Sequence, residues 1–202
     1  DPMTYNIVIK GAVRGSGTIR MGNELAINPG DVRTQLEGVP TKEPAFGLDA
    51  YWINPSQADF AKTAGYTIVD GATVIATHIN AILRDNASDL LGHDETREIL
   101  DKIAQRSPKL IDDLVPDKLS VSTIMQILKN ILFESIPIRD MNTIIDTLLL
   151  ESSRTQNSDE LTALVRPRLG RLMLQNLVPP GEELSVITLD PALEQMLIGS
   201  LQ

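Results

Sequence analysis

The chain has 202 residues, 42% of them hydrophobic and 22% charged, so it can bury an ordinary globular core. Its net charge of -9 at pH 7 repels phosphate backbones and argues against a general nucleic-acid-binding protein. Cysteine is absent, which excludes disulfides and thiolate metal sites, and no run approaches the roughly 18 apolar residues of a membrane helix. Aromatic residues make up only 3%, so the core must be aliphatic and each exposed aromatic is of interest.

The first part of the chain has the period-two alternation and the turn residues of short strands. Residues 5–13 predict a strand, and Gly11, Gly15 and Gly17 are interpreted as turn positions that break it. A short strand is expected at 25–27, closed by the Asn-Pro-Gly sequence at 28–30. Residues 31–50 are expected to form a loop with short extended pieces, and another strand follows at 51–53.

Two capped helices follow these strands. Asn54 is expected to cap a helix that has Phe60, Ala61 and Ala64 on one face and ends at Gly65. After a strand at 66–69, Asp70 is expected to cap a longer helix. Its apolar stripe comprises Val74, Ile75, Ile79, Ile82 and Leu83.

Beyond Leu91 the pattern predicts helices almost throughout. They are expected at 94–105, after Pro108, after a cap at Ser122, around 141–148 and at 159–177, with Pro167 breaking the last near Arg166. A polar linker is expected at 151–159, a strand at 184–189 and a final helix from Asp190. The fold class is therefore α+β, with small mixed α/β units followed by a mainly helical one.

The sequence offers little support for catalysis. His78 lies beside the apolar stripe of its helix and is interpreted as a core or boundary histidine, while His93 lies far away in sequence, so no metal site is indicated. The Gly15 to Thr18 turn lacks the Gly-Lys-Ser/Thr ending of a phosphate loop, and no GxSxG elbow occurs. We expect no catalytic residue, no metal and no cofactor.

Residues 43–49, Glu-Pro-Ala-Phe-Gly-Leu-Asp, place a large aromatic between small residues and a proline in an irregular stretch. Phe46 could fill a gap in a small core. It could equally form part of an exposed apolar dimple, as at many docking sites. The residues alone leave both interpretations open.

Several motifs in order resemble one known family: residues 25–30, 43–53, 65–69, 73–78, 108–110, 114–116 and 136–141. Together they are similar to the export gate proteins of type III secretion, the FlhA family, over almost the whole chain. The stretch 159–166 resembles the flagellar branch more than the virulence (injectisome) branch, which stays as the alternative.

The resemblance implies a docking platform and not an enzyme. It implies a protein at the cytoplasmic face of the bacterial inner membrane, with an N-terminal anchor outside this sequence and a cytoplasmic part that forms a nonameric ring. The implied partners are flagellar export chaperones with bound substrates and components of the export ATPase complex. No nucleic acid is expected.

The resemblance also implies four subdomains. The first is discontinuous, with residues 3–21 and 71–90, and residues 22–70 form the inserted second. Residues 91–170 form the helical third, and residues 171–202 are the start of a truncated fourth.

In this family a dimple between the first two subdomains recruits chaperones. The matching positions are Phe46, Glu43 and Thr77, with Ile27 and Pro29 as apolar lining, and Glu43 is expected on the rim, where the family often has Asp. A carboxylate enzyme using Asp49 or Asp70 would instead need a deep polar pocket. A purely structural ring component would bury Phe46.

Overall fold

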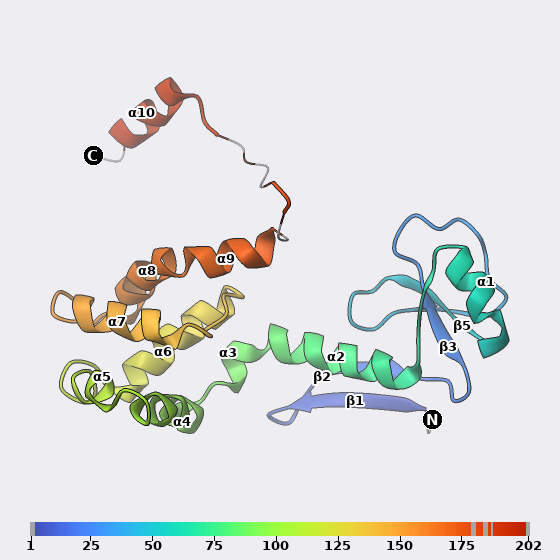
Figure 1. Ribbon diagram of the computed structural model, residues 1–202, viewed down its shortest axis with the longest axis horizontal. Helices are drawn as coiled ribbons and strands as arrows, with labels where there is room; N and C mark the ends of the chain where they lie inside the picture. Colours follow the sequence, from blue (N-terminus) through green and yellow to red (C-terminus); the bar gives the residue numbers. More distant parts are fainter. Residues whose placement is uncertain (1–2, 179–180, 184–185, 187, 201–202) are drawn as a thin grey trace.

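The computed structural model describes residues 3–178, 181–183, 186 and 188–200. Strands gather at one end of an elongated molecule and helices at the other, joined by α2 (Gly71–Asp85) (Figure 1). The N-terminal sheets are antiparallel and the rest is mainly helical, which confirms the α+β class. None of the helices formed by the described residues combines the length and the apolar character needed to cross a membrane.

The chain begins with a two-stranded hairpin, β1 (Thr4–Ile9) and β2 (Ala12–Thr18). Gly11 lies in its turn with a φ of 80°, a conformation that glycine adopts without strain. The hairpin runs alongside α2 (Figure 1).

The interpretation of Gly15 and Gly17 as turn residues is wrong, because both lie inside β2. A Cβ at Gly15 would lie 2.8 Å from Nε2 of His78, and one at Gly17 would lie 2.6 Å from the ring of Tyr5. These glycines therefore allow the strand to approach two aromatic rings closely.

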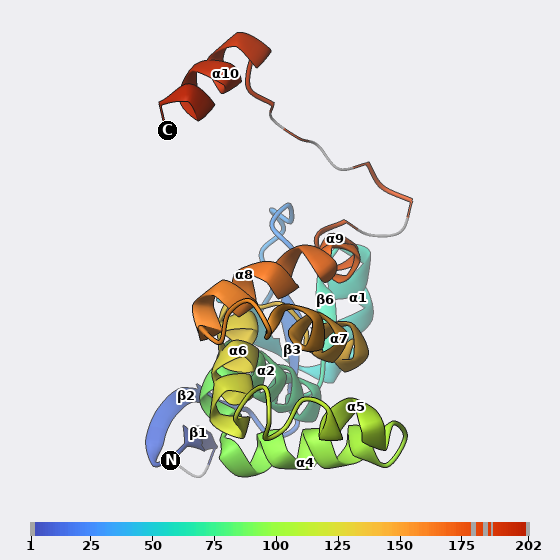
Figure 2. The same ribbon diagram turned by 90° about the vertical axis from the view of Figure 1, so that its left-hand side faces the viewer.

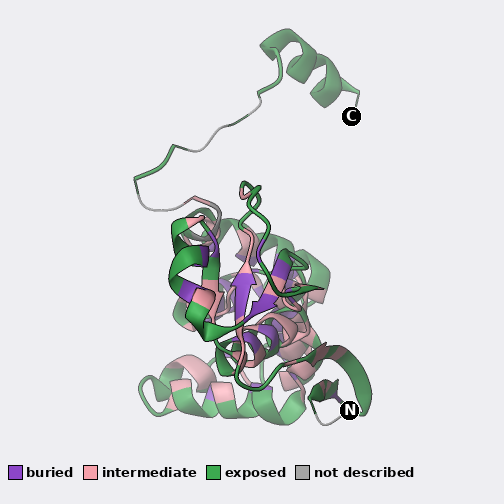
Figure 3. Ribbon diagram, turned by 90° about the vertical axis from the view of Figure 1, so that its right-hand side faces the viewer, coloured by how far each residue is buried: buried purple, intermediate pink, exposed green. Residues whose placement is uncertain are grey.

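A four-stranded antiparallel sheet follows, in the order β4-β5-β3-β6. Its strands are β3 (Glu24–Ile27), β4 (Val39–Lys42), β5 (Asp49–Ile53) and β6 (Thr67–Val69). One apolar cluster packs Ala26, Ile53 and Tyr66 against Ala61 of α1 (Ala58–Thr63). A second packs other strand residues against Val74 of α2, so the sheet lies between two helices and its central strands are buried (Figure 3).

Asn54 begins the first helical segment as expected, since its side chain accepts a hydrogen bond from the Ser56 N–H at 2.9 Å. The segment starts as the 3-10 turn η1 (Pro55–Gln57) and continues as α1. The expectation that Phe60 shares one face with Ala61 is wrong, because Phe60 is 61% exposed and Ala61 is fully buried. Ala58 and Ala61, three residues apart, take the inward face of this short helix.

Asp70 caps α2 as expected, accepting the Thr73 N–H at 2.7 Å. The stripe is shifted relative to the expectation: Val74 and His78, four residues apart, are buried, whereas Ile79 and Leu83 are 38% and 42% exposed. Gly15 of β2 leaves room for the His78 ring, so the buried face of the helix includes His78. His78 is a core residue, as predicted.

The helical region runs from α3 to α9. Its elements are α3 (Ala87–Leu90), α4 (His93–Ala104), α5 (Pro108–Asp112), α6 (Val121–Phe133), α7 (Met141–Glu151), α8 (Ser158–Arg168) and α9 (Gly170–Leu177). α6 lies between α4 and α8 (Figure 2) and buries Ile124, Ile127, Leu128 and Ile131 completely. The core is aliphatic, as the composition predicts.

Two helix ends differ from the expectation. Ser120, and not Ser122, caps α6 by accepting the Thr123 N–H at 3.0 Å. The expected helix over 159–177 divides at Leu169, just after Pro167. Pro167 has no backbone N–H to donate, which weakens the helix at this point. The strand expected at 184–189 includes residues outside the described part of the chain. Beyond it, Asp190 caps α10 (Pro191–Gly199).

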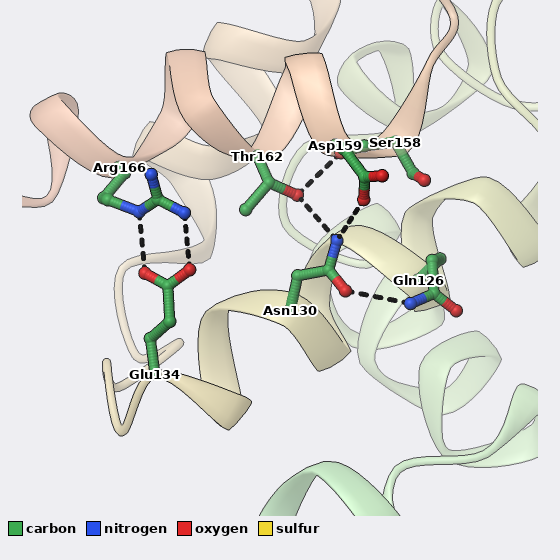
Figure 4. A network of polar contacts seen from close by, with 7 residues as sticks. All are labelled: Gln126, Asn130, Glu134, Ser158, Asp159, Thr162 and Arg166. Atoms are coloured by element: carbon green, nitrogen blue, oxygen red, sulfur yellow. Dashed lines mark hydrogen bonds and ion pairs between the residues drawn. The ribbon is translucent and has the colours of Figure 1, made fainter.

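A polar seam joins α6 to α8 (Figure 4). The Asn130 side chain donates to the Asp159 carboxylate at 3.0 Å and to the Thr162 hydroxyl at 3.3 Å. Arg166 makes a two-pronged contact with the Glu134 carboxylate, with Nε 2.7 Å from one oxygen. These contacts fix the register of the two helices at the edge of the aliphatic core.

Candidate functional site

A small hollow of about 70 Å³ lies where the four-stranded sheet meets the start of α2. It brings together four of the five candidate residues: Ile27 at the end of β3, Glu43 and Phe46 in the loop between β4 and β5, and Thr77 on α2. Pro29 is exposed and is not among the lining residues. The sequence stretches that form this hollow lie up to 50 positions apart and meet because the four-stranded sheet packs against α2.

The loop from Glu43 to Leu48 forms a single helix-like turn, and a backbone hydrogen bond joins its two ends. The Glu43 N–H donates to the Leu48 carbonyl at 2.8 Å, and the Gly47 N–H donates to the Glu43 carbonyl at 2.9 Å. Gly47 has a φ of 71°, which reverses the chain after the turn. Pro44 occupies the first position of the turn, where its missing N–H costs nothing.

The Glu43 carboxylate caps this turn from within. One oxygen accepts the Ala45 N–H at 2.9 Å and the other accepts the Phe46 N–H at 2.7 Å. Only 2% of Glu43 is exposed, so the expectation that it lies on the rim is wrong. Its charge is used to hold two backbone amides that would otherwise lack partners.

Phe46 projects from this turn with 67% of its surface exposed. This exposure decides against Phe46 as a plug in a small core, and against the purely structural reading that required its burial. Leu48, on the same loop, is 38% exposed. A large aromatic held outward beside an apolar hollow has the character of a contact residue.

The opposite wall belongs to α2, where Val74 and Thr77 lie nearly one turn apart. Directly behind them His78 is 2.9 Å from the Tyr5 hydroxyl, and the two rings meet edge-on. Burial raises the pKa of Tyr5, and the negative charge of Glu43 raises it further.

The carboxylates considered for catalysis have structural roles. Asp49 forms an exposed ion pair with Lys42 at 2.7 Å across β4 and β5. Asp70 caps α2, and hydrogen bonds from Thr73 lower its pKa. Small-molecule pockets typically measure about 300–1,000 Å³, whereas the hollow beside Phe46 has about 70 Å³, enough for a side chain. Within the described ranges, no three acidic or histidine side chains gather as metal ligands.

Leu48, Val69 and Val74 also line the hollow, and the sequence reasoning did not include them in the site. Val74 was assigned only to the stripe of its helix, and Leu48 follows Phe46 by two residues in the same motif. Their shared location depends on how the four-stranded sheet packs against α2, which no local pattern encodes.

A family model described as the FHIPEP family matches residues 1–202. The chain belongs to the FHIPEP family. Among its relatives, the flagellar biosynthesis protein FlhA of Salmonella typhimurium (strain LT2) is 43% identical over 202 residues, which are 100% of this chain and 29% of that protein. FlhA of Helicobacter pylori (strain J99) is 37% identical over 202 residues, 100% of this chain and 27% of that protein.

Solved structures share the fold of this FHIPEP member. The Chlamydia pneumoniae CdsV protein superposes with a TM-score of 0.82 at 23% identity, covering 98% of this chain and 58% of CdsV. A nonameric EPEC SctV-C gives a TM-score of 0.64 at 19% identity, covering 98% and 68%. A complex of CdsV with CdsO gives 0.78 at 24% identity, covering 98% and 60%.

Membership of the FHIPEP family supports the interpretation that this chain is not an enzyme. The chain spans somewhat under a third of the length of its flagellar relatives. It corresponds to a fragment of FlhA, as the motif resemblance implied.

Proposed function

We propose that this chain is part of the docking platform of a flagellar type III protein export gate, and that the hollow beside Phe46 receives a chaperone bound to its export substrate. The observation that carries the proposal is the exposure of Phe46, 67%, at the edge of an apolar hollow. The curated relatives at 43% identity are flagellar, which supports the flagellar branch over the virulence branch.

An amphipathic helix of the chaperone would insert an apolar side chain into the hollow and cover Phe46. The volume of about 70 Å³ suits one such side chain. Truncation of an aromatic hot spot commonly costs about 2–4 kcal/mol of binding free energy, or roughly 30- to 1,000-fold in affinity. Thr77 is half-buried on the α2 wall, where its hydroxyl offers the incoming helix a polar contact.

The remainder of the proposal concerns the whole protein. We place it at the cytoplasmic face of the bacterial inner membrane, anchored by a segment outside this sequence. Self-association into a nonameric ring is supported by the shared fold of the nonameric EPEC SctV-C. Components of the export ATPase complex are proposed as further partners, and the CdsV–CdsO complex shows a second protein bound to a relative of this fold.

We also propose the subdomain division given by the motif resemblance. The aliphatic cluster of residues 91–169 supports an independent third subdomain, and the cluster of Ala26, Ile53, Ala61 and Tyr66 supports the insert. Val74 joins Leu25, Ala50 and Trp52 in a third cluster, so α2 and the insert share a packed boundary. The proposed chaperone site lies at that boundary.

The test is calorimetric titration of the chain with a flagellar chaperone–substrate complex, comparing the parent, Phe46→Ala and Phe60→Ala. Phe60 is a matched control because it is 61% exposed on the same insert but lies outside the hollow. We expect Phe46→Ala to weaken binding by at least about 30-fold and Phe60→Ala to leave it unchanged. Equal affinities for parent and Phe46→Ala, with the fold verified by circular dichroism, would contradict the site.

A further inference from the structure

A second hollow, of about 450 Å³, lies in the helical region between the end of α4 and the start of α7. Its walls include Lys102 in the last turn of α4, Arg106 just beyond the end of that helix, and Arg139 just before α7. Half-buried Ile99, Ile103 and Met141 contribute its apolar lining and pack against the helical core. We call this hollow the basic groove.

The positive charge of the basic groove is unbalanced. Among the described residues that line it, Asp140 provides the one carboxylate, and it accepts both the N–H and the hydroxyl of Thr143, at 3.2 and 2.7 Å. Within the described part of the chain, Lys102, Arg106 and Arg139 form no ion pair. The groove is therefore a local cationic site on a chain whose net charge is -9.

The groove also extends along the surface. Arg139 lines an adjoining hollow of about 670 Å³, together with Arg84, Leu132 and Met173. That hollow too combines apolar lining with cations, and its carboxylate, Glu134, is already paired with Arg166. Two hollows that share one arginine can receive an extended or helical segment of chain.

We propose that the basic groove docks an acidic amphipathic segment of a partner protein. Acidic side chains of the segment would pair with the three cations, and its apolar side chains would lie against Ile99, Ile103 and Met141. A nucleic acid fits poorly, since none of the described residues that line the groove is an aromatic able to stack on bases, and the chain as a whole is acidic. This surface is distinct from the hollow beside Phe46 and does not depend on the function proposed for it.

The test uses the full 202-residue chain and three labelled peptides of twelve residues in fluorescence anisotropy. In the first peptide, pairs of Glu alternate with pairs of Leu, so that a helix has an acidic face and an apolar face. The second peptide replaces every Glu with Lys, and the third replaces every Leu with Ser. We expect binding of the first peptide alone, weakening as salt is raised. Binding of the Lys peptide, or equal binding of the Leu-free peptide, would overturn the proposal, as would no binding at all.

Two double variants locate the interaction. Lys102→Ala with Arg106→Ala removes two groove cations, and we expect about a tenfold loss of affinity. Arg97→Ala with Lys109→Ala removes the same charge from exposed positions outside the groove, and we expect less than a twofold change. Equal losses of affinity in the two double variants would show that only the net charge of the chain matters, and would refute the basic groove as the binding site. Sedimentation that shows the parent dimerising, and the groove variant not, would assign the surface to a second copy instead and overturn the proposed partner.

Discussion

The role of Glu43 can be tested by changing its carboxylate to an amide. In Glu43→Gln one oxygen remains as an acceptor, so one of the Ala45 and Phe46 amides loses its partner and faces an NH₂ group. A hydrogen bond to a charged group contributes about 1.5–3 kcal/mol. Its loss should raise the fraction of opened loop, and hence the exchange rate of these amides, by about 10- to 150-fold.

The assay is amide hydrogen exchange of the free chain by NMR, which needs no partner. Glu37→Gln is the matched control, because Glu37 is exposed and lies outside the hollow. Glu43→Asp should retain most of the protection, since aspartate is a favoured helix cap. Exchange at residues 45 and 46 within twofold of the parent would refute the capping role of Glu43.

Chaperone binding offers an independent check through a double-mutant cycle of Glu43→Gln and Phe46→Ala. If Glu43 acts only by holding Phe46 in place, its substitution should have little further effect once Phe46 is alanine. Additive losses would instead show that the Glu43 carboxylate contacts the partner directly.

Three further predictions concern stability. Gly17→Ala should destabilise the chain by about 1–3 kcal/mol in urea unfolding, because the new Cβ would lie 2.6 Å from the Tyr5 ring. The control Gly170→Ala meets no neighbour within 4 Å and should be neutral or stabilising. Equal effects of the two substitutions would contradict the close approach of β2 to Tyr5. Asn130→Ala should lower the unfolding free energy by about 1–2 kcal/mol through loss of the α6–α8 seam, and an unchanged urea midpoint would show that the seam contributes nothing. The pKa of Asp70 is lowered by its cap hydrogen bonds. Its contribution to the free energy of unfolding is therefore present above the unfolded pKa and is lost as pH falls through the folded pKa. Asp70→Asn still caps the helix but cannot titrate, so the parent should lose more stability than this variant between pH 7 and pH 2.5.

The local elements of this fold were largely predictable because their signals are local. Asn54 and Asp70 cap the helices that they were expected to cap, and the strands at 25–27 and 51–53 occur as the apolar runs indicated. Ser122 was expected to cap α6, but Ser120 does so; both precede the same apolar run, and sequence cannot decide which hydroxyl reaches a free N–H.

The errors lie where distant segments meet. Gly15 and Gly17 appear as turn residues until Tyr5 and His78 are seen to occupy the space where their side chains would be. Glu43 was expected at the rim because the family resemblance placed it at the edge of a docking dimple. Its burial follows from two backbone amides in a turn whose geometry the sequence did not specify.

Phe46, Thr77 and Ile27 were brought together by a resemblance of motifs, while the residues by themselves left Phe46 equally suited to a core. Val74 and Leu48 complete the hollow and depend on the packing of the insert over α2. That packing involves residues nearly 50 positions apart, beyond the range of any periodicity.

The aliphatic core of the helical region has a spectroscopic consequence. The one tryptophan and all three tyrosines fall within residues 5–66, and Trp52 is 4% exposed between the four-stranded sheet and α2. Tryptophan emission therefore reports on the insert and its boundary with α2, whereas far-ultraviolet ellipticity is dominated by the helices. One protein thus carries separate optical reporters for its two halves, and denaturation curves that fail to coincide would reveal two halves unfolding separately.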